Sequence, residues 1–148
     1  RPHEDELQPN RDRMEEQVIH YCVAHGIPII ATCRGMQYIN VMFGGKLWYH
    51  PKLPVNRTRG VDHQVWLVKE QRNIWVNNYH SDCIYEEGLA SCFEPLAIDR
   101  ENHVVEAYGS DEMKILALQW HPERRFETAN AYEETRKIIL DFIQKYVK

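Results

Sequence analysis

Long apolar runs and an excess of positive charge are both missing from this sequence of 148 residues. No run approaches the ~20 apolar residues that a helix needs to cross a bilayer, so we expect no membrane partner. The chain has 22 acidic and 18 basic residues and a formal net charge of −4, which argues against a nucleic-acid surface. At this length we expect one globular domain.

Paired cysteine motifs are missing: the four cysteines are scattered and show no CxxC spacing. The sequence therefore predicts neither a disulfide framework nor a zinc site, and a reducing, cytoplasmic setting is the expectation. The eight histidines contain no HExxH pattern of the kind found in zinc peptidases. We expect no metal and no cofactor.

One stretch near the N-terminus organises the rest of the prediction. A run of β-formers over 27–32 ends in Cys33, Gly35 follows two positions later, and apolar residues then recur at helical spacing. This pattern predicts a strand, a tight turn and a helix. Such a turn projects the Cys33 side chain above the carboxyl end of the strand, near helix N–H groups that favour the thiolate. The alternative is that Cys33 is a small buried residue at a strand end.

A second stretch supplies the partners that a cysteine nucleophile needs. An apolar run over 115–118 leads to His121, and Glu123 follows across Pro122. Proline fixes its own φ and keeps the preceding residue out of the helical region, so His121 and Glu123 lie on a rigid bend. A nucleophile, a base and a group that orients the base are the three roles of a catalytic triad.

The remaining segments indicate an α/β sandwich. Alternating apolar residues predict strands over 62–68 and 74–76, and 95–108 is typical of a β-hairpin with a polar turn. The clearest helix is predicted over 127–148, with one apolar stripe for the core. This order predicts three layers, with a mixed, largely parallel sheet and helices on both faces.

Four segments together resemble the class I glutamine amidotransferase-like superfamily, and most closely its γ-glutamyl hydrolase-like (peptidase C26) branch. They are Cys33-Arg34-Gly35-Met36-Gln37, Asn40 to Gly45, Val76-Asn77-Asn78-Tyr79-His80, and Gln119-Trp120-His121-Pro122-Glu123. The resemblance implies a flavodoxin-like core. It also implies that the family's N-terminal strands and Gly-Gly loop are missing here, so that 1–148 is the C-terminal portion of a longer glutamine amidotransferase-like domain.

By the same resemblance, Cys33 is the nucleophile, His121 the general base and Glu123 its orienter. The N–H of Arg34 forms one half of an oxyanion hole, and the other half belongs to the missing N-terminal part. The resemblance assigns the substrate contacts to four residues. These are Gln37, Asn78, Tyr79 and His80. From the residues alone, a hydrogen-bonded structural histidine is the preferred interpretation of His80.

The implied activity is hydrolysis of a γ-glutamyl amide of a small molecule, releasing glutamate and a free amine through a glutamyl thioester. One alternative is a glutaminase subunit that supplies ammonia to a synthase partner. A second is a non-catalytic relative that binds a γ-glutamyl ligand. A homo-oligomer is left open.

Overall fold

The computed structural model describes residues 9–53 and 58–147, with side chains from Asp12 onward. From residue 27 onward, the strands and helices that the sequence predicts appear in the expected order. The elements are α1 (Pro9–Ala24), β1 (Ile29–Thr32), α2 (Arg34–Met42), β2 (His63–Leu67), β3 (Arg72–Val76), the 3₁₀ turn η2 (Glu86–Gly88), β4 (Glu94–Asp99), β5 (Val104–Ser110), β6 (Ile115–Leu118) and α3 (Ala131–Tyr146).

The strands form one six-stranded sheet in the order β1-β6-β5-β4-β2-β3. The mixed sheet is confirmed, but the prediction that it is largely parallel is wrong. Among the described strands, only β1 and β6 pair in parallel, whereas β6–β5, β5–β4, β4–β2 and β2–β3 are antiparallel. The reason is that short turns join β2 to β3, β4 to β5 and β5 to β6, and a short turn can only reverse the chain.

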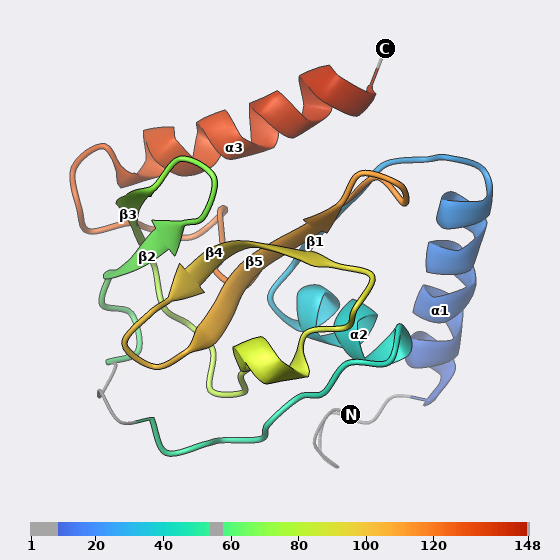
Figure 1. Cartoon of the computed structure of the whole chain (residues 1–148), viewed down its shortest axis with the longest axis horizontal. Helices are drawn as coiled ribbons and strands as arrows, with labels where there is room; N and C mark the ends of the chain where they lie inside the picture. The colour runs from blue at the N-terminus through green and yellow to red at the C-terminus, as the bar shows by residue number, and fades with distance from the viewer. Residues whose placement is uncertain (1–8, 54–57, 148) are drawn as a thin grey trace.

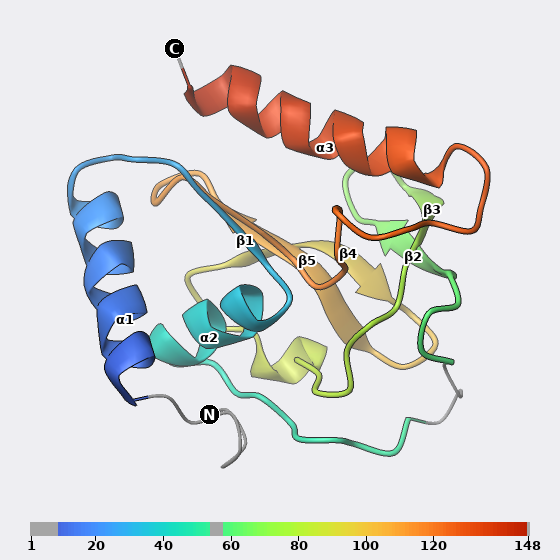
Figure 2. The same ribbon diagram turned by 180° about the vertical axis from the view of Figure 1, so that it is seen from behind.

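The sheet lies between two helical layers, as predicted. Helices α1 and α2 cover one face and α3 covers the other (Figures 1 and 2). Each interface has its own apolar core: Met36 and Ile39 of α2 belong to the first, and Ile138 and Phe142 of α3 pack against the second. The three-layer α/β class is therefore confirmed. No helix in the described ranges is long and apolar enough to cross a bilayer.

Helix α3 is shorter than predicted because the backbone at Asn130 leaves the right-handed helical region. It begins at Ala131, not at residue 127, and Asn130 has a left-handed φ of 67°. One oxygen of Asp62 accepts the backbone N–H groups of Glu127 and Thr128. A helix that started at residue 127 would leave these two N–H groups without an internal partner, so the bonds to Asp62 fix this loop but do not by themselves end the helix.

Strand β1 is an edge strand that leaves apolar side chains in contact with solvent. Among the described strands its only partner is β6. Ile30 of β1 is 40% exposed, and Met14 and Val18 of the neighbouring helix α1 are also exposed. The outer side of β1 is relevant to the oxyanion hole, because Cys33 follows directly after this strand.

Candidate active site

Cys33 occupies a strained turn between β1 and α2. Its φ of 49° and ψ of −109° place it in a region that L-residues rarely adopt. Its N–H donates to the carbonyl of Leu118 on β6 (2.8 Å), and its own carbonyl accepts the N–H of Gln37 (3.1 Å). A strand, a cysteine with positive φ and a helix that starts at once form the elbow that presents a nucleophile.

The environment of Cys33 favours the neutral thiol. Burial raises the pKa of this thiol and outweighs the backbone N–H of Arg34, which lowers it. The guanidinium of Arg124 also lowers the pKa, whereas Glu123 raises it. The sequence-based expectation that helix N–H groups favour the thiolate is correct in direction, but burial dominates. The thiol therefore needs a base to remove its proton.

Arg34 contributes to the site through its backbone, because its side chain is used elsewhere. The guanidinium contacts Asp12 (2.6 Å) and Glu15 (3.4 Å), both on α1. These ion pairs fasten the start of α2 to α1. The backbone N–H of Arg34 lies at the Cys33 sulfur, where it lowers the pKa of the thiol.

His121 and Glu123 form a close hydrogen-bonded pair. Nδ1 of His121 lies 2.8 Å from a carboxylate oxygen of Glu123. Burial alone would raise the pKa of Glu123, but its own N–H and His121 hold it below the ordinary value. An ionised carboxylate can only accept, so Nδ1 carries the proton and Nε2 is left as the basic nitrogen.

The parallel pairing of β1 with β6 brings Cys33 and the His121–Glu123 pair to the same end of the sheet. Thr32 is the register partner of Leu118, so Cys33 and the segment that carries His121 leave neighbouring carboxyl ends. The side chain of Gln119 donates to the sulfur of Cys33 at 3.9 Å. Glu123 is also close enough to influence the Cys33 pKa. The three residues predicted as a triad thus lie in one region.

Asn77 is a site residue that the sequence analysis did not single out. Its side chain is fully buried. It donates to the carbonyl of His121 (2.8 Å) and accepts the N–H of the same residue (2.9 Å). This pair of bonds fixes the backbone of His121. In the sequence, Asn77 was marked only by its position in the motif over 76–80, in which the three residues that follow it were predicted to contact the substrate.

Replacing Asn77 by alanine should lower the free energy of unfolding by roughly 2–3 kcal/mol, because two backbone groups of His121 lose their buried partner. Urea unfolding would measure the change. Asn73→Ala is the matched control, since Asn73 is exposed on β3, the strand that leads to Asn77. Equal stability of the two variants would contradict the role assigned to Asn77.

Tyr79 and Asn78 lie beside this segment. The ring of Tyr79 makes an edge contact with the His121 ring (5.9 Å between centroids). The guanidinium groups of Arg59 and Arg124 lie over the Tyr79 ring at 5.6 and 4.7 Å. Asn78 is buried and donates to the carbonyl of Thr58 (3.2 Å), while its side-chain oxygen has no hydrogen-bond partner among the described residues. Tyr79 and both arginines therefore border the site.

Gln37 is almost completely buried, on the side of the site that faces the protein interior. Its side-chain nitrogen donates to the carbonyl of Asp82 (3.1 Å) and to the side-chain oxygen of Gln119 (3.2 Å). Gln119 in turn contacts the Cys33 sulfur. The structure thus links Gln37 to Cys33 through one intervening side chain.

The imidazole of His80 points into the protein interior. Its side chain is 2% exposed and lies 3.4 Å from the fully buried carboxylate of Glu106. Its Nδ1 lies 2.9 Å from the carbonyl of Asp82. The ring therefore fits a structural histidine, and any substrate contact by His80 would have to come from its backbone. Glu106, which holds this ring, was not predicted.

Buried charge at His80 predicts a pH-dependent stability. Burial lowers its pKa, but the Glu106 carboxylate, together with Cys83, outweighs burial and raises the pKa from 6.5 to about 10. A raised pKa gives stability that is complete below the unfolded value and is lost as pH rises through the folded value. The free energy of unfolding should therefore fall from about pH 7 toward pH 10, by at most ~1.4 kcal/mol per pH unit.

The check is urea unfolding across this pH range in the wild type and in Glu106→Gln. The stability difference between the two proteins should shrink as pH rises. Glu94→Gln removes a carboxylate that is 60% exposed and serves as the control. Parallel pH profiles for wild type and Glu106→Gln would disprove the ion pair.

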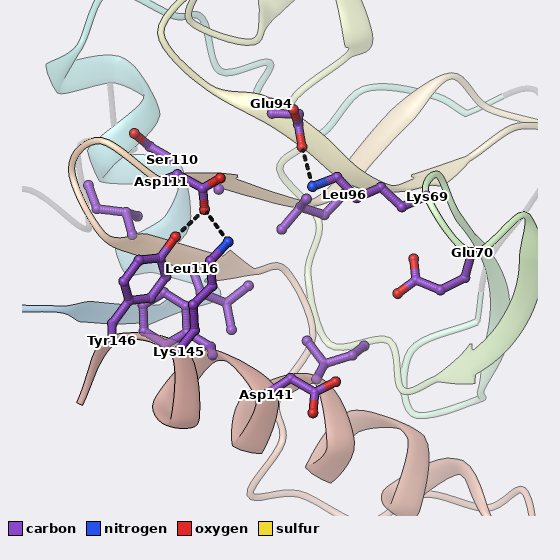
Figure 3. Close-up of a pocket in the computed structure, with 14 residues that line it drawn as sticks. Lys69, Glu70, Glu94, Leu96, Ser110, Asp111, Leu116, Asp141, Lys145 and Tyr146 are labelled. Atoms are coloured by element: carbon purple, nitrogen blue, oxygen red, sulfur yellow. Dashed lines mark hydrogen bonds and ion pairs between the residues drawn. The ribbon is translucent and has the colours of Figure 1, made fainter. Parts of the chain in front are cut away.

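A pocket between α3 and the sheet lies away from these residues (Figure 3). It is bordered by the start of β6, so it faces the opposite end of that strand from Leu118. Several of its polar side chains contact one another: Lys145 and Tyr146 contact Asp111, and Lys69 contacts Glu94 at 3.3 Å (Figure 3). It contains none of the predicted site residues. In the described part of the chain no cluster of side chains suits a metal ion.

Comparison with known proteins assigns this chain to a family. The model of the Peptidase C26 family matches residues 1–123. The chain is 31% identical over 136 residues to a putative glutamine amidotransferase-like protein, YvdE, of Lactococcus lactis, covering 81% of this chain and 56% of that protein. It is 28% identical over 145 residues to the γ-glutamyl-γ-aminobutyrate hydrolase PuuD of Escherichia coli, covering 81% and 55%.

A third relative is the aminodeoxychorismate/anthranilate synthase component 2 of Bacillus subtilis, which is 27% identical over 135 residues, covering 90% of this chain and 66% of that protein. The solved structure of a glutamine amidotransferase from Thermotoga maritima aligns with a TM-score of 0.61 at 17% identity, covering 90% and 55%, which shows a shared fold. The chain spans about half the length of the curated relatives it matches.

Proposed function

Because this chain belongs to the peptidase C26 family, we propose that it carries the catalytic residues of an enzyme that hydrolyses a γ-glutamyl amide. The family relatives include hydrolases and amidotransferases, which supports an enzyme. One observation carries the proposal. The strained turn at Cys33 lies at the same end of the sheet as the hydrogen-bonded pair of His121 and Glu123.

In the proposed reaction, Nε2 of His121 takes the proton of Cys33, and the sulfur attacks the γ-carbonyl of the substrate. The carbonyl oxygen becomes an oxyanion that accepts the N–H of Arg34. Protonated His121 then gives its proton to the leaving amine as the C–N bond breaks, which leaves a glutamyl thioester. A water molecule, deprotonated by His121, attacks the thioester and releases glutamate and the free thiol.

We propose that the second oxyanion donor lies outside the described residues. Arg34 supplies one backbone N–H, and a single donor is less than such holes ordinarily use. The outer edge of β1 has no strand partner within 9–53 and 58–147, so a further segment would find free backbone groups next to Cys33. Removal of one oxyanion donor typically costs ~10²–10³ in rate.

A second candidate is a glutaminase subunit that passes ammonia to a synthase. The Bacillus subtilis relative, a component of a synthase, favours it, and the chain covers 66% of that protein. The catalytic residues would be the same, and glutamine would be the substrate. The non-catalytic alternative has less support, because cysteine, histidine and glutamate are all present at the site.

The deciding experiment is glutamate release from glutamine and from a panel of γ-glutamyl amides, with the Cys33→Ala protein as the blank. Release from a bulky γ-glutamyl amide, with glutamine nearly inert, is the expected result. Release from glutamine that rises when a candidate synthase is added would favour the subunit. Absence of release from every amide would refute the hydrolase.

A further inference from the structure

A line of buried polar side chains runs from the middle of the sheet to Cys33. It starts at Glu106 on β5 and continues through His80, Gln37 on α2 and Gln119 after β6. Glu106 and Gln119 are fully buried, Gln37 is 8% exposed, and the His80 side chain is 2% exposed. Buried polar groups are costly unless each has a partner, so a connected line of them calls for an explanation.

The hydrogen bonds in this line have a defined direction. The carbonyl of Asp82 can only accept, so Nδ1 of His80 (2.9 Å) and the side-chain nitrogen of Gln37 (3.1 Å) both donate to it. Gln37 also donates to the side-chain oxygen of Gln119 (3.2 Å). The oxygen of Gln119 is thus occupied as an acceptor, and its amide nitrogen faces the Cys33 sulfur at 3.9 Å.

The far end of the line is an ion pair that fixes the His80 ring. The carboxylate of Glu106 lies 3.4 Å from Nε2 of His80, and its other oxygen lies 3.7 Å from Nε2 of His63. The ring is held between this carboxylate and the Asp82 carbonyl, and the latter also binds Gln37. Movement of His80 would therefore disturb the acceptor that sets the orientation of Gln37.

We propose that Gln119 is a positioning residue for the nucleophile: it donates an N–H to the Cys33 thiolate, while Gln37 and the Glu106–His80 pair hold its amide in that orientation. A charged sulfur accepts a stronger hydrogen bond than a neutral thiol. Gln119 therefore favours ionisation of Cys33 in a site where burial opposes it. The inference rests on the proposed function only in taking Cys33 as the nucleophile.

The test is the pH dependence of Cys33 alkylation by iodoacetamide, read for each cysteine by peptide mass spectrometry. Gln119→Met keeps an unbranched side chain of similar length but has no donor. It should raise the midpoint of Cys33 alkylation by about one pH unit, which is the size expected for one charge-assisted hydrogen bond. Glu106→Gln should shift the midpoint in the same direction by less. Gln64→Met, at an exposed position of β2, should leave it unchanged.

A midpoint in Gln119→Met equal to the wild-type value would overturn the inference. Should that variant not fold, the side-chain amide of Gln119 in the wild type provides a second measurement by nuclear magnetic resonance. Its signals should shift with the ionisation of Cys33 and should stay constant over that pH range in Cys33→Ala. Signals that ignore the Cys33 titration would also overturn the inference.

These outcomes are separate from those of the proposed function. Alkylation needs no substrate, so a protein that releases glutamate from no amide would still report whether Gln119 lowers the pKa of Cys33. Conversely, glutamate release with an unchanged alkylation midpoint in Gln119→Met would keep the hydrolase and remove the role of Gln119.

Discussion

Glutamate release by the Cys33→Ala protein is expected to fall at least ~10⁴-fold, to the level of the blank without protein. Alanine has no nucleophilic atom, so neither the attack on the γ-carbonyl nor the thioester can form, and removal of a triad nucleophile costs rate by several powers of ten. The measurement is glutamate release from the best amide of the panel, at saturating concentration.

The fold should survive this substitution, which makes the result specific. Alanine is smaller than cysteine, and the elbow is held through the backbone N–H and carbonyl of residue 33. Thermal unfolding should therefore give a similar midpoint for the two proteins. Cys92→Ala, at an exposed cysteine, is the control and should keep full activity. Turnover retained by Cys33→Ala would refute the nucleophile.

The second large effect is expected for His121→Asn, with a loss of about 10³-fold in kcat. Asparagine retains an N–H that can reach Glu123, but it has no basic nitrogen at the position of Nε2. Since burial raises the pKa of Cys33, the thiol would keep its proton at neutral pH without this base. The leaving amine would also lose its proton donor.

The residual activity of His121→Asn should have its own pH signature. With no base present, attack depends on spontaneous ionisation of Cys33, so the rate should continue to rise with pH beyond the ordinary thiol pKa. His20→Asn, at an exposed position of α1, is the control. A wild-type rate for His121→Asn, or a residual rate independent of pH, would remove His121 from the mechanism.

Local patterns were sufficient for the elements that position the nucleophile. The β-run before Cys33, the glycine after it and the helical spacing that follows involve residues adjacent in the chain, so their structure depends little on distant parts. The same holds for the bend at Pro122, where the His121–Glu123 pair forms within three residues. These features correspond to the predicted strand, elbow and rigid bend.

Contacts between residues on different strands could not be predicted from the sequence. The largely parallel sheet was predicted from element order, but the short turns after β2, β4 and β5 make most pairs antiparallel. His80 was assigned to substrate by resemblance, yet its ring meets Glu106, which is distant in sequence. Asn77 and Gln119 showed no chemistry of their own until their partners were known.

The sequence by itself determined the α/β class, the nucleophile turn, the His-x-Glu bend and the family. It did so because these depend on short-range periodicity, on the restricted backbone of proline and on motifs read along the chain. Only the tertiary structure decided which buried amide faces the Cys33 sulfur, which carboxylate holds His80 and which side chain fixes His121. Those partners are set by strand register, and register places together residues that are far apart in sequence.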